Sequence, residues 1–198
     1  MQIENHKEEV PFSYYEEKFR SADAAQIAAR LPDVPFDGNG FTLTLLGKTY
    51  TVTYPDCVIA PAAPLPMQTF LLRFLLEGKT VAPTGNWLTF REMPWGELYI
   101  KPYTGRVLTR AAFTFGTRIE AFRKAAEALG GTPVKHGDAG FEFALIGNYT
   151  MRILVWAGDE EFPPNAQVLY SDNFAGGVAA EDRVVAGDLL ISHIKAAM

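Results

Sequence analysis

The sequence is poor in the residues that build self-contained metal and cluster sites. It has one cysteine, Cys57, and three histidines, His6, His136 and His193. A single cysteine excludes an intrachain disulfide framework, a self-contained iron–sulfur cluster and a cysteine-rich zinc site. The three histidines lie far apart in the chain and have no zinc-ligand spacing. We therefore predict no metal site built from cysteine or histidine in this chain.

The sequence also lacks a long hydrophobic run and an excess of basic charge. Its most hydrophobic segment, residues 69–76, is interrupted by Arg73 and is much shorter than a membrane span of about 20 residues. The 18 Lys and Arg residues stand against 23 Asp and Glu residues, which gives a formal net charge of −5 and a pI near 5.2. Because nucleic acids and anionic membranes attract concentrated basic charge, we expect neither as a partner.

What the chain does contain is enough apolar material for one folded unit. Hydrophobic residues make up 48% of its 198 residues and the mean hydropathy is −0.00, which excludes disorder as the main state. No repeat or long linker divides it, so we expect a single globular domain over residues 1–198. Residues 1–9 are polar, and we expect them to be disordered. They contain no apolar core of a secretion signal, which makes the cytoplasm the expected location.

Apolar residues near helical spacing predict helices in three stretches, and acids followed by His193 and Lys195, as the helix dipole favours, predict a fourth. These are residues 12–31, 67–77, 107–129 and 181–197. The first stretch is expected to bend near Ser21 and to end before Pro32. The third is interrupted at residues 114–117, so we expect two helices there. Helices therefore begin and end the folded part of the chain.

Alternating apolar and polar residues around short glycine-containing turns predict two β-hairpins, at residues 41–54 and 141–156. Shorter strands are predicted at 87–91 and 166–170, while residues 98–102 form either a strand or an extended connection. Helices and hairpins occupy separate blocks, without strict β-α-β alternation. That order favours an α+β fold, a single domain in which antiparallel β-hairpins pack with several helices.

Some short segments match parts of known enzyme motifs, but the other residues that these motifs require are missing. Two Gly-Lys-Thr tripeptides, at 47–49 and 78–80, lack the glycine that a phosphate loop needs five residues earlier. By residue type alone, Cys57, His136 and Asp138 could form a catalytic triad with Cys57 as the nucleophile. Its apolar neighbours favour a buried thiol instead.

The first candidate binding segment is a run of three acids after the second hairpin. Asp159, Glu160 and Glu161 come directly after an apolar strand, and Phe162 and two prolines come next. Carboxylates held together at a sheet end can bind a hard cation, pair with arginine or act as acid/base groups. The alternative is a solvated turn anchored by Phe162.

The second candidate binding segment begins at Trp87. If residues 87–91 form a strand, Trp87 and Arg91 share one face, and the indole and guanidinium can form a stacking and cation pocket. Glu92, the next residue, is included among the candidate ligand-binding residues. The alternative is ordinary packing around an ion pair between Arg91 and a carboxylate.

Four sequence blocks together resemble a known family. They are Pro83 to Glu92 with Gly96 and Tyr99, Ala128 to Gly131 with Gly137-Asp138, Trp156 to Pro163, and Leu169 to Asp172 with Glu181-Asp182. The family is the bacterial and archaeal domain-of-unknown-function family numbered 3786, which has no established activity. Some relatives are joined to a cysteine-rich iron–sulfur domain, which implies an intracellular, often anaerobic setting. The cysteines of that fused form are missing from this chain, so the resemblance implies an iron–sulfur or other redox protein as a partner.

The leading hypothesis of function is a non-catalytic accessory protein that binds a small molecule, an unidentified cofactor or a redox partner. The alternative is an enzyme that uses Asp159, Glu160 and Glu161, together with Asp172 or Asp138, as acid/base groups or divalent-metal ligands. A third hypothesis is a structural homodimer with an aromatic interface.

Overall fold

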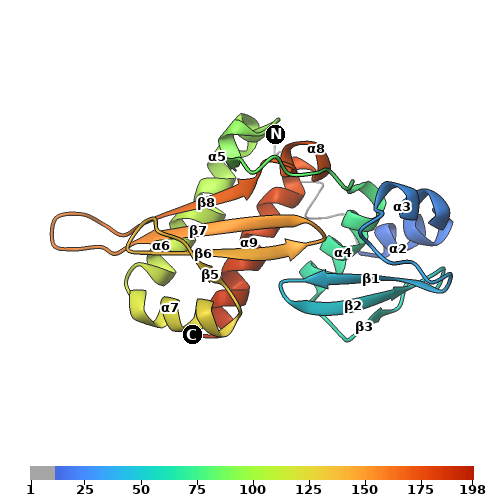
Figure 1. Cartoon of the computed structure of the whole chain (residues 1–198), viewed down its shortest axis with the longest axis horizontal. Coiled ribbons are helices and arrows are strands. Elements are labelled where there is room, and N and C mark those ends of the chain that lie inside the picture. The colour runs from blue at the N-terminus through green and yellow to red at the C-terminus, as the bar shows by residue number, and fades with distance from the viewer. Residues whose placement is uncertain (1–11) are drawn as a thin grey trace, which may run out of the picture.

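The backbone of the fold is an antiparallel sheet whose strands lie in the order β3-β2-β1-β6-β7-β8-β4, with β5 paired to β6 (Figure 1). A computed structural model describes residues 12–198, so the expected disorder of residues 1–9 lies outside the described residues. The strands are β1 (Gly40–Leu45), β2 (Lys48–Thr53), β3 (Ile59–Ala60), β4 (Trp87–Thr89), β5 (Thr132–Pro133), β6 (Ala139–Ile146), β7 (Tyr149–Trp156) and β8 (Asn165–Ser171). The sheet thus ends in two very short strands, β3 and β4.

Helices pack against this sheet and begin and end the described chain, as predicted. They are α2 (Phe12–Ser21), α3 (Ala24–Arg30), α4 (Leu65–Glu77), η1 (a 3₁₀ turn, Phe90–Glu92), α5 (Gly96–Tyr103), η2 (a π-helical turn, Thr104–Thr109), α6 (Arg110–Phe115), α7 (Ile119–Ala128), α8 (Phe174–Gly177) and α9 (Ala180–Ala196). The predicted α+β class is confirmed. Within residues 12–198, no helix has the length and apolar character needed to cross a membrane.

Both predicted hairpins are confirmed, and their turns explain why. In the β1–β2 turn, Leu46 and Gly47 have φ angles of 48° and 78°. In the β6–β7 turn, Gly147 has a φ of 54° and is followed by Asn148. Positive φ in two-residue turns matches the right-handed twist of the flanking strands. The first turn consists of Leu46 and Gly47, between the end of β1 at Leu45 and the start of β2 at Lys48.

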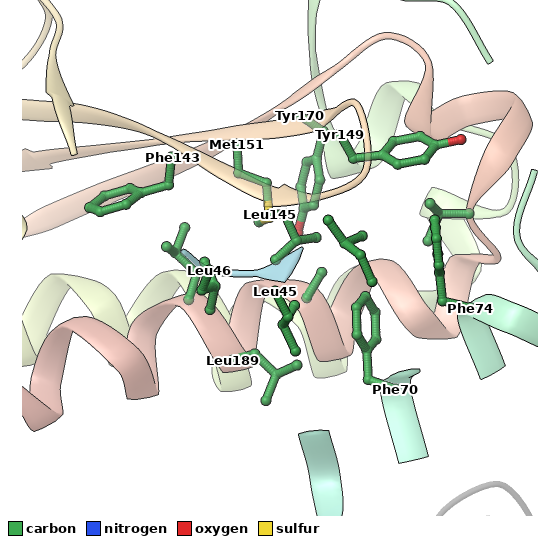
Figure 2. Close-up of a cluster of buried hydrophobic side chains, with 14 of the residues drawn as sticks. Leu45, Leu46, Phe70, Phe74, Phe143, Leu145, Tyr149, Met151, Tyr170 and Leu189 are labelled. Carbon is green, nitrogen blue, oxygen red and sulfur yellow. The ribbon is translucent and has the colours of Figure 1, made fainter. Parts of the chain in front are cut away.

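The two hairpins meet through a narrow junction and a shared core. Leu45 pairs with Ile146, and the Leu46 amide donates to the Leu145 carbonyl over 2.8 Å. Figure 2 shows the side chains gathered around this point. They come from β1 and its turn (Leu45, Leu46), α4 (Phe70, Phe74), β6 and β7 (Phe143, Leu145, Tyr149, Met151), β8 (Tyr170) and α9 (Leu189). One hydrophobic cluster therefore spans both halves of the sheet.

The predicted bend near Ser21 is a complete break between α2 and α3. Oδ1 of Asp23 accepts hydrogen bonds from the amides of Ala25 (2.9 Å) and Gln26 (3.4 Å), which caps the second helix at its start. The interruption predicted at residues 114–117 is also confirmed, since α6 ends at Phe115 and α7 begins at Ile119.

Two strand predictions were wrong in part or in full. Residues 98–102 belong to helix α5; Leu98 is 71% exposed and Pro102 lies inside the helix, so neither periodicity nor composition indicated it. Pro102 has no amide hydrogen, and the chain widens into the π-helical turn η2 directly after α5. The strand predicted at 87–91 ends at Thr89, because Thr89 and Glu92 form a capping box that starts η1.

Candidate functional site

An open groove of about 610 Å³ lies where α5, α8 and the first turn of α9 meet the end of α4. Its volume falls in the range of small-molecule binding sites. The described residues that line it come from three separate segments, residues 77–79, 94–99 and 175–183. None of the sequence motifs pointed to this place, because no single segment contains it.

The wall formed by residues 94–99 is aromatic and strained. Trp95 lines the groove, is 69% exposed and has a φ of +66°, in the left-handed region. A bulky residue at positive φ is an outlier that persists only where its surroundings enforce it. Here the next residue is Gly96, where a Cβ would overlap the carbonyl oxygen of Phe90 and lie 2.9 Å from that of Arg91. The tight turn therefore holds an exposed indole at the groove.

The turn that carries Trp95 is held in place by two buried aromatic rings that stack on each other. Phe90 of η1 stacks on Tyr103 of α5, with ring centroids 4.0 Å apart and an interplanar angle of 8°. Both rings are 1% exposed. Because offset or stacked aromatic pairs contribute about 0.5–1.5 kcal/mol beyond their buried area, this pair fixes η1 and α5 relative to each other.

The segment from α8 to α9 gives the groove a lining of small side chains, Ala175, Gly176, Gly177, Val178, Ala179 and Ala180. α9 begins at Ala180, and its N-cap residue Ala179 provides no side-chain hydrogen bond. Small residues at this place allow a ligand to approach the backbone closely.

A buried arginine ties the lining segments together. Arg183 is 3% exposed, and its Nε and Nη1 atoms each donate over 2.8 Å, to the carbonyls of Val178 and Pro94. Its Nη2 donates to the Ala175 carbonyl over 3.1 Å. Burial lowers the pKa of this guanidinium, which nevertheless stays charged at neutral pH. One cation thus joins the Trp95 turn, α8 and α9.

The acidic groups of the groove have partners on the protein. The Tyr99 hydroxyl donates to the Glu181 carboxylate, and this hydrogen bond raises the pKa of Tyr99. Oε2 of Glu77 lies 3.8 Å from Nη2 of Arg73. Lys79 also lines the groove and is exposed.

Trp87 lies outside this groove, and a cation stacks on it as the pattern suggested, but the cation is not Arg91. The guanidinium carbon of Arg152 lies 3.9 Å from the centroid of the Trp87 ring. Nε of Arg152 also lies 2.9 Å from Oε2 of Glu142. Strand β8 lies between β4, which carries Trp87, and β7, which carries Arg152, so sequence spacing alone could not pair these two residues.

Arg91 and Glu92 make local contacts. Arg91 pairs with Glu97 at 2.8 Å, and both side chains are more than 60% exposed (63% and 68%). The Glu92 carboxylate accepts from the Thr89 amide over 2.7 Å and from its hydroxyl over 2.8 Å, which lowers the pKa of Glu92. These contacts match the alternative in which Arg91 forms an ion pair, and neither residue lines the groove.

Asp172 fastens the chain segment that leads into β4. Its Oδ1 accepts from the Thr84 amide over 3.0 Å and its Oδ2 accepts from the Thr84 hydroxyl, while its own amide donates to the Asn86 carbonyl. Nearby, the side-chain amides of Asn148 and Asn173 both donate to the Val81 carbonyl. The segment is therefore held against the β6–β7 turn and the end of β8.

Replacing Asp172 by alanine is expected to speed amide hydrogen exchange at Thr84 and Asn86. The hydrogen bonds from Thr84 lower the pKa of Asp172, so its contribution to holding the segment is present at neutral pH and is lost only as the pH falls through that lowered value. Exchange measured by mass spectrometry or NMR checks this. Asp56→Ala, at an exposed turn position, is the control; equal protection in the two variants contradicts the assignment.

The three consecutive acids lie at the far end of the β7–β8 hairpin, which extends away from the helices (Figure 1). Oδ1 of Asp159 accepts from the amides of Phe162 (2.7 Å) and Glu161 (2.9 Å), and these bonds lower its pKa. Glu160 and Glu161 are exposed, and Phe162 is 66% exposed, so it does not anchor the turn.

The structure does not bring these acids together with other candidate ligands. Asp138 contacts the base of the same loop, where its Oδ2 accepts from the Ala157 amide over 2.8 Å, whereas Asp172 binds Thr84. Among residues 12–198, no group of three or more His, Cys, Asp or Glu side chains is placed to hold a metal ion. Cys57 is buried, and burial raises the pKa of its thiol to about 11, which keeps it protonated at neutral pH.

Comparison with known proteins gives one match. The model of a family described as a domain of unknown function (DUF3786) matches residues 23–193. This range includes every segment that lines the groove and leaves out α2. No curated protein and no solved structure gives a match to the chain.

Proposed function

The chain belongs to the DUF3786 family, whose shared domain has no assigned function, and on that premise we propose that it is an accessory protein that binds a small organic molecule or cofactor in the groove. The observation that carries this proposal is Trp95, an exposed indole held at positive φ beside a cavity of about 610 Å³. Strained backbone and exposed aromatic rings both concentrate at binding sites.

The lining indicates a ligand with a flat apolar part. Trp95 and Tyr99 provide aromatic rings, Leu98 is 71% exposed, and residues 175–180 add a surface of small side chains. A planar ring can pack against the indole while its other face lies near the backbone of α8. Such stacking contributes about 0.5–1.5 kcal/mol in addition to the buried area.

The enzyme hypothesis has no comparable support. Asp159, Glu160 and Glu161 lie on the outer loop of a hairpin and do not line the groove. A role beside an iron–sulfur or other redox protein in the cytoplasm fits an accessory binding protein, and it remains part of the proposal.

Replacing Trp95 by alanine is expected to weaken binding of aromatic ligands at least about tenfold, a factor that corresponds to about 1.4 kcal/mol. The free energy of unfolding should hardly change, because the side chain is 69% exposed. A thermal-shift screen of aromatic compounds, followed by calorimetric titration of the compounds that bind, provides the measurement.

Trp156→Ala is the matched control, since Trp156 is also exposed but lies at the end of β7, outside the groove lining. It should leave the affinity unchanged. If Trp95→Ala binds the same compounds as tightly as the unmodified protein, or if no aromatic compound binds, the proposed function is wrong.

A further inference from the structure

We propose that the groove selects ligands with a negatively charged group, a carboxylate or a phosphate, which Arg183 and Lys79 attract. This inference rests on the proposed function and names the ligand class of the same site. The ligand would then combine a planar apolar part, placed at Trp95, with an anionic group near Arg183 and Lys79.

The main observation is a buried positive charge that forms no ion pair at contact distance, although the Glu181 carboxylate acts on it from beyond that distance. Arg183 is 3% exposed, and the acceptors of its three hydrogen bonds are neutral backbone carbonyls. A guanidinium has five N–H donors, so donors remain after these bonds are made. Buried arginines are nearly always paired with a counter-charge. Because Arg183 lines the groove, an anion bound there would supply one.

The other charged residues of the groove also leave positive charge without an ion-pair partner. Both acids are engaged, Glu77 near Arg73 and Glu181 with the Tyr99 hydroxyl. Lys79, by contrast, makes no ion pair within residues 12–198. The two cations are therefore the charged groups of the lining that lack an opposite charge at contact distance.

The N-terminal end of α9 also favours the binding of an anion in the groove. It is a helix of 17 residues whose N-cap, Ala179, has no capping side chain, and Ala179 and Ala180 both line the groove. The positive end of the helix dipole thus faces the same cavity as Arg183. Glu181 and Asp182 in the first turn offset part of this field, so the attraction of an anion depends mainly on Arg183 and the helix end only adds to it.

The test compares four ligands that share one ring system and differ in charge. They are 2-naphthoate, 2-naphthyl phosphate, neutral 2-naphthamide and protonated 2-naphthylmethylamine. We expect at least one of the two anions to bind at least about tenfold more tightly than the amide at low salt, with the ammonium compound weakest. The preference should shrink as salt is added, because ions screen the charges.

Substitutions at Lys79 and Arg183 test whether the anion preference comes from these two cations and not from a change in folding. Lys79→Met should reduce the ratio of anion to amide affinity, because it removes one of the two cations of the lining. Lys124→Met, at an exposed position of α7, is the control and should leave this ratio unchanged. Arg183→Met should abolish the anion preference; if it does not fold, as judged by circular dichroism, Lys79→Met and the salt series still decide.

Equal affinities for all four compounds, or tightest binding of the ammonium compound, overturn the proposed anion selectivity while leaving the binding groove in place. Absence of binding by all four, together with an empty thermal-shift screen, removes the proposed function itself. The ratio of naphthoate to naphthyl phosphate affinity distinguishes a carboxylate site from a phosphate site.

Discussion

Replacing Arg73 by leucine is expected to lower the free energy of unfolding by about 3–5 kcal/mol at pH 7.5, as measured by urea denaturation. Arg73 lies in α4, and Asp182 lies in the first turn of α9 directly behind the groove. Their side chains are only 9% and 7% exposed. Removing the guanidinium leaves a buried carboxylate without a counter-charge, which costs far more than the lost contact.

The geometry of this pair accounts for the size of the effect. Nε of Arg73 lies 2.7 Å from Oδ1 of Asp182, although its N–H is not aligned for a hydrogen bond with that atom. Nη2 donates to Oδ2 over 3.1 Å, and Nη1 donates to the Tyr15 hydroxyl over 3.1 Å. Arg73 therefore connects α2, α4 and α9 at one point.

The cost should depend on pH. Burial raises the pKa of Asp182 to about 6 even with Arg73 present, so the folded state binds this proton more tightly than the unfolded chain, where aspartate titrates near 3.9. The contribution of Asp182 to stability is thus greatest below the unfolded value and is lost as the pH rises through about 6. Without Arg73 the shift grows, so the variant should lose less stability at pH 5 than at pH 7.5.

A surface pair provides the control for Arg73. Arg91→Leu breaks an ion pair of nearly the same length, 2.8 Å, but with both partners mostly exposed. Exposed pairs contribute at most about 1 kcal/mol. The double variant Arg73→Leu with Asp182→Leu should recover most of the stability, since no charge is then left buried. A loss of less than about 1 kcal/mol for Arg73→Leu alone contradicts the assignment.

Gly96→Ala is expected to destabilise the fold by about 3 kcal/mol, near the upper end of the usual cost of overpacking. The new Cβ would overlap the Phe90 carbonyl oxygen and lie 2.9 Å from the carbonyl oxygen and 3.0 Å from the Cα of Arg91. All three are backbone atoms of η1 and cannot move independently. The turn that holds Trp95 must then open, so ligand affinity should fall together with the free energy of unfolding.

Gly105→Ala is the matched control for this substitution. Gly105 lies in the π-helical turn η2, and a Cβ there has no atom within 4 Å. Alanine should be neutral or stabilise the protein by up to about 1 kcal/mol, because it restricts the unfolded chain. Equal unfolding midpoints for the two variants would mean that the Trp95 turn is looser than the structure indicates.

The sequence predicts those parts of the fold that depend on local pattern. Both hairpins were predicted because each has a glycine in its turn, where the backbone takes a positive φ. Helix α4 was predicted from its apolar face, and α9 from the acids in its first turn and the bases in its last. Helix α5 was missed because its outward-facing Leu98 and its internal Pro102 contradict such a pattern. The local sequence pattern gives no sign of this short helix, whose last residue, Tyr103, stacks on Phe90 of the turn before it.

The candidate site was harder to predict from the sequence, because it is assembled from segments that are far apart in the chain. Arg183 and Pro94, which share a hydrogen bond in the groove, are 89 positions apart. Trp87 was recognised as a stacking group, yet its cation comes from Arg152, across two strand pairings. The one local signal in the groove was the Pro94-Trp95-Gly96 sequence, where a bulky aromatic residue stands in a tight turn.

The short strands at the two ends of the sheet have a consequence for association between copies of the chain. β3 has two residues and β4 has three, so each of these strands has few backbone groups to pair with another strand, and the long strand β7 is paired along both of its sides. Exposed edge strands are the usual templates for strand addition and amyloid-like growth. β3 and β4 are therefore poor templates for strand addition, and a homodimer formed through either of them would gain few backbone hydrogen bonds.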